Sequence, residues 1–238
     1  MNGFLYGVAL QWKLDIRSKS LLVTCYIVPL IFFLLMGGIF TSVMPEMRST
    51  LIQSMIVMSV SMGAFIGLPP SLTETYGSDI KKVYKANGVP ICLGLVTMFL
   101  SAFVHLMITC VLMVLLATVL FEAALPTQLP FFFLALAIYI IVSLSIGSIF
   151  GLMVKTQAKL TMIAQLVFLP SIMLSGIMFP IELLPDFLEA IGRIFPASWG
   201  YRLMLDNGFC LENLWYLILV LCAAVIICAI LLNKQKSE

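Results

Sequence analysis

The chain has 238 residues, of which 62% are hydrophobic and only 10% are charged, whereas soluble domains carry about 25% charged residues. This composition excludes an ordinary soluble protein and indicates an integral membrane protein. The net charge of +2 gives no indication of a nucleic-acid partner, and the sequence contains no Walker-type phosphate loop for binding ATP.

Residues 1–19 are predicted to form an amphipathic helix on the membrane surface. Leu5, Ala9, Trp12 and Ile16 recur at helical spacing with charged residues between them, which is typical of interfacial helices. Trp12 is expected at the level of the lipid headgroups. The apolar stretch that follows is about 20 residues long, the length of a retained span rather than of a cleaved signal.

Six apolar stretches follow and are predicted to span the membrane as helices. The third could reach about 45 Å at about 1.5 Å per residue, so it is expected to tilt or to project from a hydrocarbon core of about 30 Å. The second is expected to end at Pro69-Pro70, and Pro170 is expected to kink the fifth. The predicted spans are 21–40, 51–68, 91–121, 131–154, 160–178 and 215–232.

The distribution of Lys and Arg predicts the orientation. If the N-terminus is inside, ten of these residues lie on the inner side and three on the outer side, which is the bias that membrane proteins show. Both termini are then cytoplasmic. The inner set is Lys13, Arg17, Lys19, Lys81, Lys82, Lys85, Lys155, Lys159, Lys234 and Lys236, and the outer set is Arg48, Arg193 and Arg202.

Small residues recur four positions apart in two spans, which allows helix backbones to approach closely. Packing within one bundle is the simpler interpretation, and an interface between subunits is the alternative. The two rows are Ser59, Gly63 and Gly67, and Ser143, Gly147 and Gly151.

The inner loop between the second and third spans contains a helix, predicted over residues 75–88. Ser78 can cap it, Asp79 suits its first turn, and Asn87-Gly88 can end it in a left-handed turn. One face would carry Tyr76, Ile80, Val83 and Tyr84, and the other Lys81, Lys82 and Lys85. The helix is interpreted as a docking element for a partner, with a membrane-surface helix on anionic lipid as the alternative.

His105, the only histidine, lies in the third span. We expect it to bond to a neighbouring helix, with a proton relay or a substrate ligand as the alternative. The absence of charged residues deep in the six spans argues against a pump that uses buried carboxylates. No catalytic residue and no metal site are predicted, because one histidine with scattered acids cannot supply a set of metal ligands.

After the fifth span, Leu174–Trp199 is too short and too rich in proline to cross a bilayer. The chain breaks at Ser175-Gly176 and then contains Pro180, Pro185 and Pro196. We therefore expect residues 179–199 to form a re-entrant helical segment on the outer face.

A short helix pattern lies between Pro185 and Pro196. Glu189 and Arg193 are four residues apart, in the favourable order for an ion pair on a helix. The apolar face would either pack against the bundle or line an exit path. It consists of Phe187, Leu188, Ile191, Ile194 and Phe195.

Three of these features together resemble the ABC-2 type transporter permease family, the membrane subunits of ABC exporters. The first is the series Phe179-Pro180, Leu184-Pro185 and Phe195-Pro196, which is similar to that family's outer re-entrant helices. The second is the segment from Glu74 to Pro90, which resembles its coupling helix region and carries Gly77 near its start. The third is the amphipathic helix before six spans.

The resemblance implies a single all-α ABC-2 type transmembrane domain over residues 1–238 in the cytoplasmic (inner) membrane. It implies a permease that pairs with itself or a homologue and docks a separate cytoplasmic ATPase. The ATPase would bind ATP and Mg, so this chain would hold no cofactor and would not itself be an enzyme. The cargo would be amphipathic or lipid-like, such as a drug, antibiotic or peptide. A non-transporting membrane scaffold or immunity protein is the alternative.

The resemblance also implies two groups of functional residues. The ATPase-coupling group is Glu74, Tyr76, Gly77, Asp79, Ile80, Lys81, Lys82, Val83, Tyr84 and Lys85. The outer re-entrant gate is Ser175, Gly176, Pro180, Pro185, Phe187, Leu188, Ile191 and Pro196.

Overall fold

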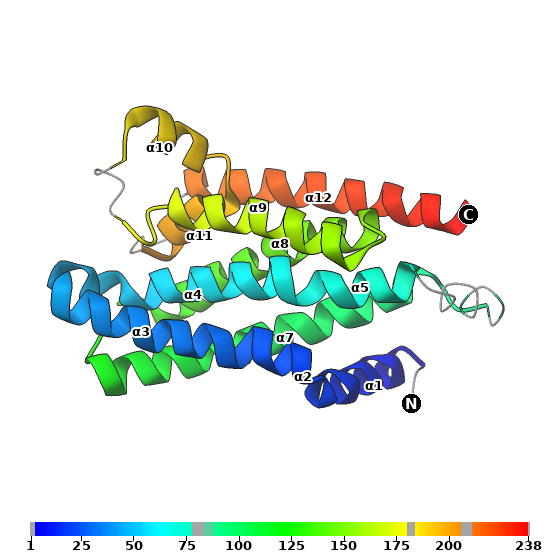
Figure 1. Cartoon of the computed structure of the whole chain (residues 1–238), viewed down its shortest axis with the longest axis horizontal. Helices are drawn as coiled ribbons and strands as arrows, with labels where there is room; N and C mark the ends of the chain where they lie inside the picture. The colour runs from blue at the N-terminus through cyan, green and yellow to red at the C-terminus, as the bar shows by residue number, and fades with distance from the viewer. Residues whose placement is uncertain are drawn as a thin grey trace.

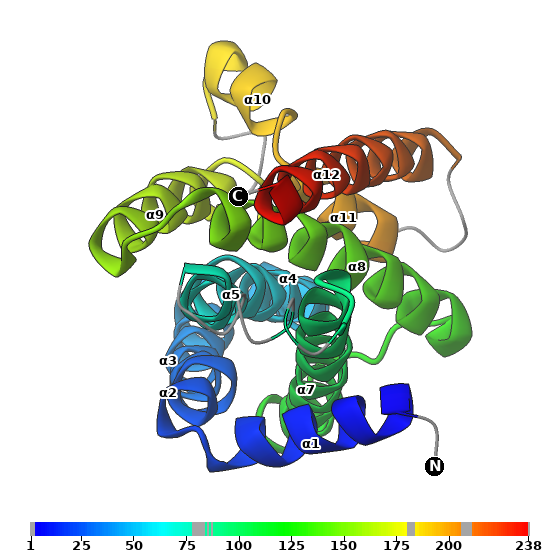
Figure 2. The same ribbon diagram turned by 90° about the vertical axis from the view of Figure 1, so that its right-hand side faces the viewer.

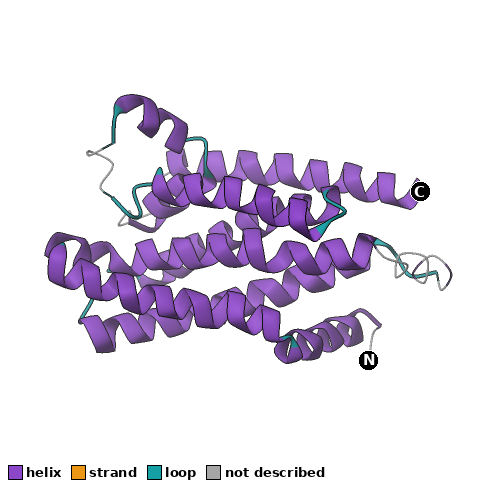
Figure 3. Cartoon of the chain, viewed as in Figure 1, coloured by secondary structure: helices purple, strands orange, loops and turns teal. Residues whose placement is uncertain are grey.

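The structure is a computed structural model, and it describes residues 3–77, 84, 86, 88–179, 184–205 and 211–237. Helices, joined by short turns, make up the described part of the chain, which contains no strand (Figure 3). The prediction of an all-α membrane protein is confirmed. Within the described ranges, five helices are long and apolar enough to cross a membrane, and a sixth apolar helix, α9, has 17 residues.

Helices cover each of the six predicted spans, and several of them begin or end at other residues than predicted. The first span is α2 (Lys19–Leu22), the π-helix η1 (Val23–Ile27) and α3 (Val28–Val43), and the second is α4 (Leu51–Met62), the π-helix η3 (Gly63–Gly67) and α5 (Leu68–Gly77). The others are α7 (Cys92–Phe121), α8 (Leu129–Met153), α9 (Gln157–Met173) and α12 (Leu211–Ser237). Outside the spans lie α1 (Gly3–Arg17), the 3₁₀ helix η2 (Pro45–Thr50), α10 (Asp186–Gly192) and α11 (Pro196–Leu205).

The long helices run side by side along the longest axis of the molecule (Figure 1). Both chain termini lie at one end of the bundle, which we call the terminal end, and α10 lies at the other, which we call the distal end. The two ends of the chain thus lie at the same end of the bundle, the arrangement that an even number of crossings would produce.

Helix α4 forms the centre of the bundle. All its residues from Leu51 to Ser61 are buried, because α3, α7, α8, α9 and α11 all pack around it (Figure 2). A helix that is mostly apolar around its circumference and whose polar residues are uncharged suits such a position.

The prediction that the second helix ends at Pro69-Pro70 is wrong. The helix continues through both prolines to Gly77. Proline normally breaks a helix because it cannot donate to the carbonyl four residues earlier and its ring clashes with that carbonyl. Here the π-helix η3 comes directly before, and Leu68 already donates to the carbonyl of Gly63, five residues back. The wider turn therefore accommodates the two prolines.

The rows of small residues pack within the bundle, which confirms the simpler interpretation. Gly147 of α8 lies against the backbone carbonyl of Ala64 in η3, where a Cβ would have no room. A Cβ on Gly151 would lie 2.6 Å from that of Leu72. The absence of side chains thus brings α8 close to the second span.

Helix α1 lies across the bundle beside α7 (Figure 2). The indole of Trp12 stacks on the imidazole of His105, with ring centroids 4.3 Å apart. Nearby, the Asp15 carboxylate is buried and accepts hydrogen bonds from Gln11 and Ser101. Ala9 and Ile16 of the predicted apolar face are exposed, while Asp15 faces α7.

His105 hydrogen-bonds to a neighbouring helix, as expected. Its Nδ1 lies 2.6 Å from the hydroxyl of Tyr26 in η1. One turn further along α7, Thr109 donates to the backbone carbonyl of Cys25, also in η1. These contacts fasten the π-helical part of the first span to α7.

Candidate functional site

The predicted coupling group divides into residues that the structure describes and residues that it does not. Asp79, Ile80, Lys81, Lys82, Val83 and Lys85 lie outside the described residues. Glu74, Tyr76 and Gly77 form the last turns of α5, as part of the second span and not of a separate helix. Glu74 and Gly77 are exposed, and Tyr76 is buried.

Tyr76 joins the end of α5 to the start of α7. Its hydroxyl donates to the backbone carbonyl of Ile91 at 2.6 Å and accepts from the backbone N–H of Leu95 at 2.9 Å. The side chain is only 5% exposed, so these bonds are shielded from competing water. The two ends of the segment between Gly77 and Pro90 are therefore held together at its base.

The described residues at the far end of that segment also lie against α7. The backbone N–H of Val89 donates to the carbonyl of Tyr84 at 2.9 Å, and Gly88 has a φ of +65°. The predicted left-handed turn is thus confirmed at Gly88, where glycine avoids the cost of a Cβ. Gly94 leaves room for both tyrosines, since a Cβ there would lie 3.3 Å from the ring of Tyr84 and 3.4 Å from the hydroxyl of Tyr76.

Two further hydrogen bonds connect α5 to the helices on its other side. Thr73 donates to the backbone carbonyl of Gly151 in α8 at 3.1 Å, and Gln157 of α9 donates to that of Pro70 at 3.2 Å. A displacement of the end of α5 would therefore act on α7, α8 and α9 together.

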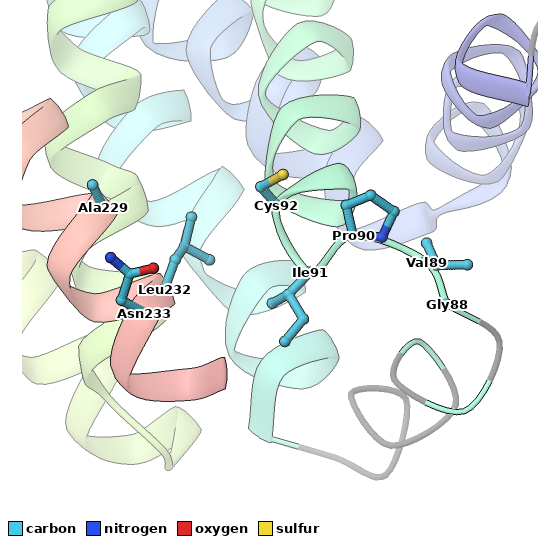
Figure 4. Close-up of a pocket in the computed structure, with 8 residues that line it drawn as sticks. All are labelled: Gly88, Val89, Pro90, Ile91, Cys92, Ala229, Leu232 and Asn233. Atoms are coloured by element: carbon cyan, nitrogen blue, oxygen red, sulfur yellow. The ribbon is translucent and has the colours of Figure 1, made fainter. Parts of the chain in front are cut away.

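A pocket of about 700 Å³ opens beside this junction, between the start of α7 and the last turns of α12 (Figure 4). Its walls are formed by residues 88–92 on one side and by Ala229, Leu232 and Asn233 on the other. Ile91 lines it and also accepts the hydrogen bond from Tyr76. This pocket could not be predicted from the sequence, because its two walls are far apart in the chain.

At the distal end, α10 is held by backbone contacts on both sides. The break at Ser175-Gly176 is confirmed, with Gly176 at a φ of +82°. Gly192, the last residue of α10, lies against the carbonyl of Leu174, where a Cβ would not fit. The hydroxyl of Ser198 in α11 donates to the carbonyl of Gly192 at 2.6 Å.

Aromatic side chains continue this attachment to α12. The indole N–H of Trp199 donates to the carbonyl of Arg193, and the hydroxyl of Tyr216 donates to that of Ile194, both at 2.6 Å. The rings of Trp199 and Tyr216 stack with centroids 4.8 Å apart. The turn after α10 is thus fixed to α11 and α12 together.

Three charged residues of this region, Glu189, Arg193 and Arg202, form one cluster. Arg193 pairs with Glu189 at 2.8 Å, as predicted from their spacing, and Arg202 lies 3.6 Å from the same carboxylate. Arg202 also lies over the ring of Trp199, 5.6 Å from its centroid. The hydrogen bond from Arg193, with the charges of both arginines, holds the pKa of Glu189 below its usual range.

The apolar face of α10 does not pack on its own bundle as the simpler interpretation predicted. Phe187 is 65% exposed and Ile191 is 42% exposed, whereas Leu188 is half-buried. Pro185 is exposed before α10, Pro196 is buried at the start of α11, and Pro180 lies outside the described residues. The exposed face is available for lipid, cargo or another subunit.

Comparison with known protein families gives one finding. The family model described as ABC-2 type transporter matches residues 4–209. No curated protein matches the chain significantly. The matched region runs from α1 to the end of α11 and includes both the Tyr76 junction and α10.

Proposed function

Because the chain belongs to the ABC-2 type transporter family, we propose that it is the permease subunit of an ATP-binding cassette exporter. A separate cytoplasmic ATPase would bind ATP and Mg and drive it. The cargo would be amphipathic or lipid-like, such as a drug, antibiotic or peptide. The observation that carries the coupling part of this proposal is the junction at Tyr76, which joins the base of the predicted docking segment to two long helices.

The docking surface would be the segment between Gly77 and Pro90, with its lysines Lys81, Lys82 and Lys85. The bias of Lys and Arg toward the terminal end supports placing this segment, and both chain termini, in the cytoplasm. The exporter would then lie in the cytoplasmic membrane with α10 on the outer face.

The position of α1 supports a docking segment that stands clear of the lipid. Helix α1 contacts α7 at Ser101 and His105. If α1 lies on the inner membrane surface, the part of α7 from Cys92 to Ser101 extends from that surface into the cytoplasm by roughly 14 Å, at about 1.5 Å per residue. The long third span would thus bring the docking segment within reach of a cytoplasmic protein.

Movement at the docking segment has a continuous route to the distal end. From Gly77 the second span runs through α5, η3 and α4 without a break. Near the start of α4, Ser54 donates to the hydroxyl of Tyr201 in α11 at 3.4 Å, and α11 is bonded to α10 through Ser198. ATP-driven displacement of α5 would reach the outer segment by this route.

The proposed cargo class follows from the chemistry of the helices and of α10. The sequences of α3, α7 and α8 contain no Asp, Glu, Lys or Arg, so these helices offer no charge to a small ion. Phe187 and Ile191 present an exposed apolar surface at the distal end. A second permease copy would complete the transport path for the cargo. Phe187 and Ile191 would then contact that copy or the cargo as it leaves.

The test is reconstitution of the permease with its cognate ATPase in sealed vesicles. We expect ATP hydrolysis to rise when amphipathic cargo is added, and the cargo to move across the membrane. The matched control is the same complex with the phosphate-loop lysine of the ATPase replaced, in which both activities should disappear. A permease that neither binds the ATPase nor changes its activity would contradict the proposal and favour a non-transporting role.

A further inference from the structure

A second cavity lies at the distal end, away from α10. It has a volume of about 290 Å³ and lies between η2, the start of α4, the loop 124–128, the start of α8 and the end of α11. Its polar lining consists of Ser49, Thr50, Gln53, Thr127 and Gln128. Hydroxyl and amide groups from two separate parts of the chain, residues 49–53 and 127–128, thus meet in one hollow.

Gln53 lines this cavity with a side-chain amide that is not fully hydrogen-bonded. Its side chain lines the cavity and is only 7% exposed, and its amide oxygen is buried with no hydrogen-bond partner in the described part of the chain. Buried amide groups in folded proteins almost always have a partner. Rotation about the last side-chain bond exchanges the amide oxygen and nitrogen, so Gln53 can offer the cavity either an acceptor or donors.

Two charged residues that the structure describes near the cavity, Arg48 and Glu122, are paired with each other. Arg48 precedes Ser49 in the chain, and its guanidinium lies 2.8 Å from the Glu122 carboxylate while Nε donates to the carbonyl of Phe121. Neither Arg48 nor Glu122 is among the described residues that line the cavity. The described lining therefore carries no charge to attract an ionised group.

The remaining lining is apolar and includes Phe132 and Met204. A ligand that fits would thus need hydroxyl groups to hydrogen-bond the polar side of the cavity and a carbon surface to pack against its apolar side. The cavity has the volume of roughly ten water molecules at about 30 Å³ each, which suits a single sugar ring. We propose that it binds an uncharged, hydroxyl-bearing sugar head, the polar part of an amphipathic glycoside, on the outer face of the permease.

This inference rests on the proposed export function for its place on the outer face and for the amphipathic nature of the ligand. It narrows the cargo class to molecules with a neutral hydroxylated head. A glycolipid of the outer leaflet has the same chemistry, so the experiment must separate the two sources.

The experiment uses the full-length permease in phosphatidylcholine nanodiscs, without the ATPase. The probe is an octyl glucoside with a photoreactive diazirine in its alkyl chain, and labelled peptides are identified by mass spectrometry. We expect labelling of peptides that contain residues 49–53 and 124–132. A phosphocholine probe with the same chain should not label them, because its head is charged.

Gln53→Leu keeps the side-chain volume and removes the amide, so it should lower the labelling about fivefold, the equivalent of one hydrogen bond. The control is Gln165→Leu, the same change at an exposed position of α9, with labelling unchanged. Thermal unfolding of both variants shows whether each is folded. Should Gln53→Leu not fold, Gln53→Met, which is unbranched and also lacks the amide, replaces it with the same expected loss.

Unchanged labelling of the folded Gln53 variant, or equal labelling by the phosphocholine probe, would overturn the inference. If glucosyl diacylglycerol added to the nanodisc lowers the labelling by the glucoside probe, the natural ligand of the cavity is a glycolipid of the bilayer. If the labelling is unchanged by that lipid, the natural ligand is a separate cargo molecule. Because the labelling experiment contains no ATPase, its result is independent of the transport test. The sugar site can be disproved while ATPase-driven transport is observed, and transport can be disproved while the sugar site is observed.

Discussion

The hydroxyl of Tyr76 donates a hydrogen bond to the backbone carbonyl of Ile91 at 2.6 Å and links the end of the second span to the start of the third. The same hydroxyl accepts from the backbone N–H of Leu95. A single buried side chain thus fixes the spacing of the two helices that lead to and from the proposed docking segment. The proposed coupling of the docking segment to α7 depends mainly on this contact.

Tyr76→Phe tests the contact directly. The change keeps the ring but removes both hydrogen bonds, and should destabilise the junction by about 1–3 kcal/mol. We expect the ATPase to bind as before, while cargo-stimulated ATP hydrolysis falls, because docking movement no longer passes firmly to α7. Tyr6→Phe, at an exposed position of α1, serves as the control. Equal stimulation in Tyr76→Phe and wild type would show that the junction does not transmit the movement.

The lysines of the docking segment give a second prediction. Replacing Lys81, Lys82 and Lys85 together by Glu should abolish co-purification with the ATPase while membrane insertion is unchanged. Reversal of Lys13 and Arg17 on α1, also on the predicted inner side, is the control and should leave co-purification intact. Unchanged ATPase stoichiometry in the triple variant would favour a membrane-surface helix instead.

Because α8 lies close to η3, we predict that replacing Gly147 by Ala lowers the stability of the protein much more than the same change at Gly38. Gly147→Ala should lower the free energy of unfolding by about 1–3 kcal/mol, because its methyl group would meet the carbonyl of Ala64 in a packed core. Gly38→Ala is the matched control in another span, since a Cβ there meets nothing within 4 Å. Thermal unfolding in detergent measures both, and similar stability of the two variants would contradict the packing.

The outer charge cluster predicts a dependence on pH. The pKa of Glu189 is held below its usual value of about 4.3, first by the hydrogen bond from Arg193 and then by the charges of Arg193 and Arg202. Its contribution to holding α10 is therefore present above that usual value and is lost as the pH falls through the lowered pKa.

Hydrogen exchange of the α10 amides, corrected for the chemical rate at each pH, measures this effect. Protection should be constant near neutral pH and should fall under acidic conditions, and Glu189→Gln should remove the acid-dependent part. A profile that is the same in Glu189→Gln and wild type would show that the cluster does not hold α10.

Local patterns in the sequence predicted much of this arrangement. Apolar length located the helices, with Cys92–Phe121 observed where 91–121 was predicted. Spacing of four residues predicted the pair of Glu189 and Arg193, and glycine after asparagine predicted the turn at Gly88. Each of these depends only on residues within one continuous stretch of the chain.

Features that depend on distant parts of the chain could not be predicted. The stacking of Trp12 on His105 and the burial of Asp15 beside Ser101 require α1 to cross α7. The helix through Pro69-Pro70 requires the π-turn before it, and π-turns have no reliable sequence signal. Both cavities are likewise formed by walls that only the fold brings together.

The central claim is that the segment between Gly77 and Pro90 faces the cytoplasm and docks an ATPase. The most direct measurement is photo-crosslinking in intact cells, with a photoreactive amino acid at position 82 and, as the control, at position 189. We predict a crosslinked product between the permease and its ATPase from position 82 and none from position 189. A product from position 189, or none from position 82 when both proteins are expressed and inserted, would contradict the claim.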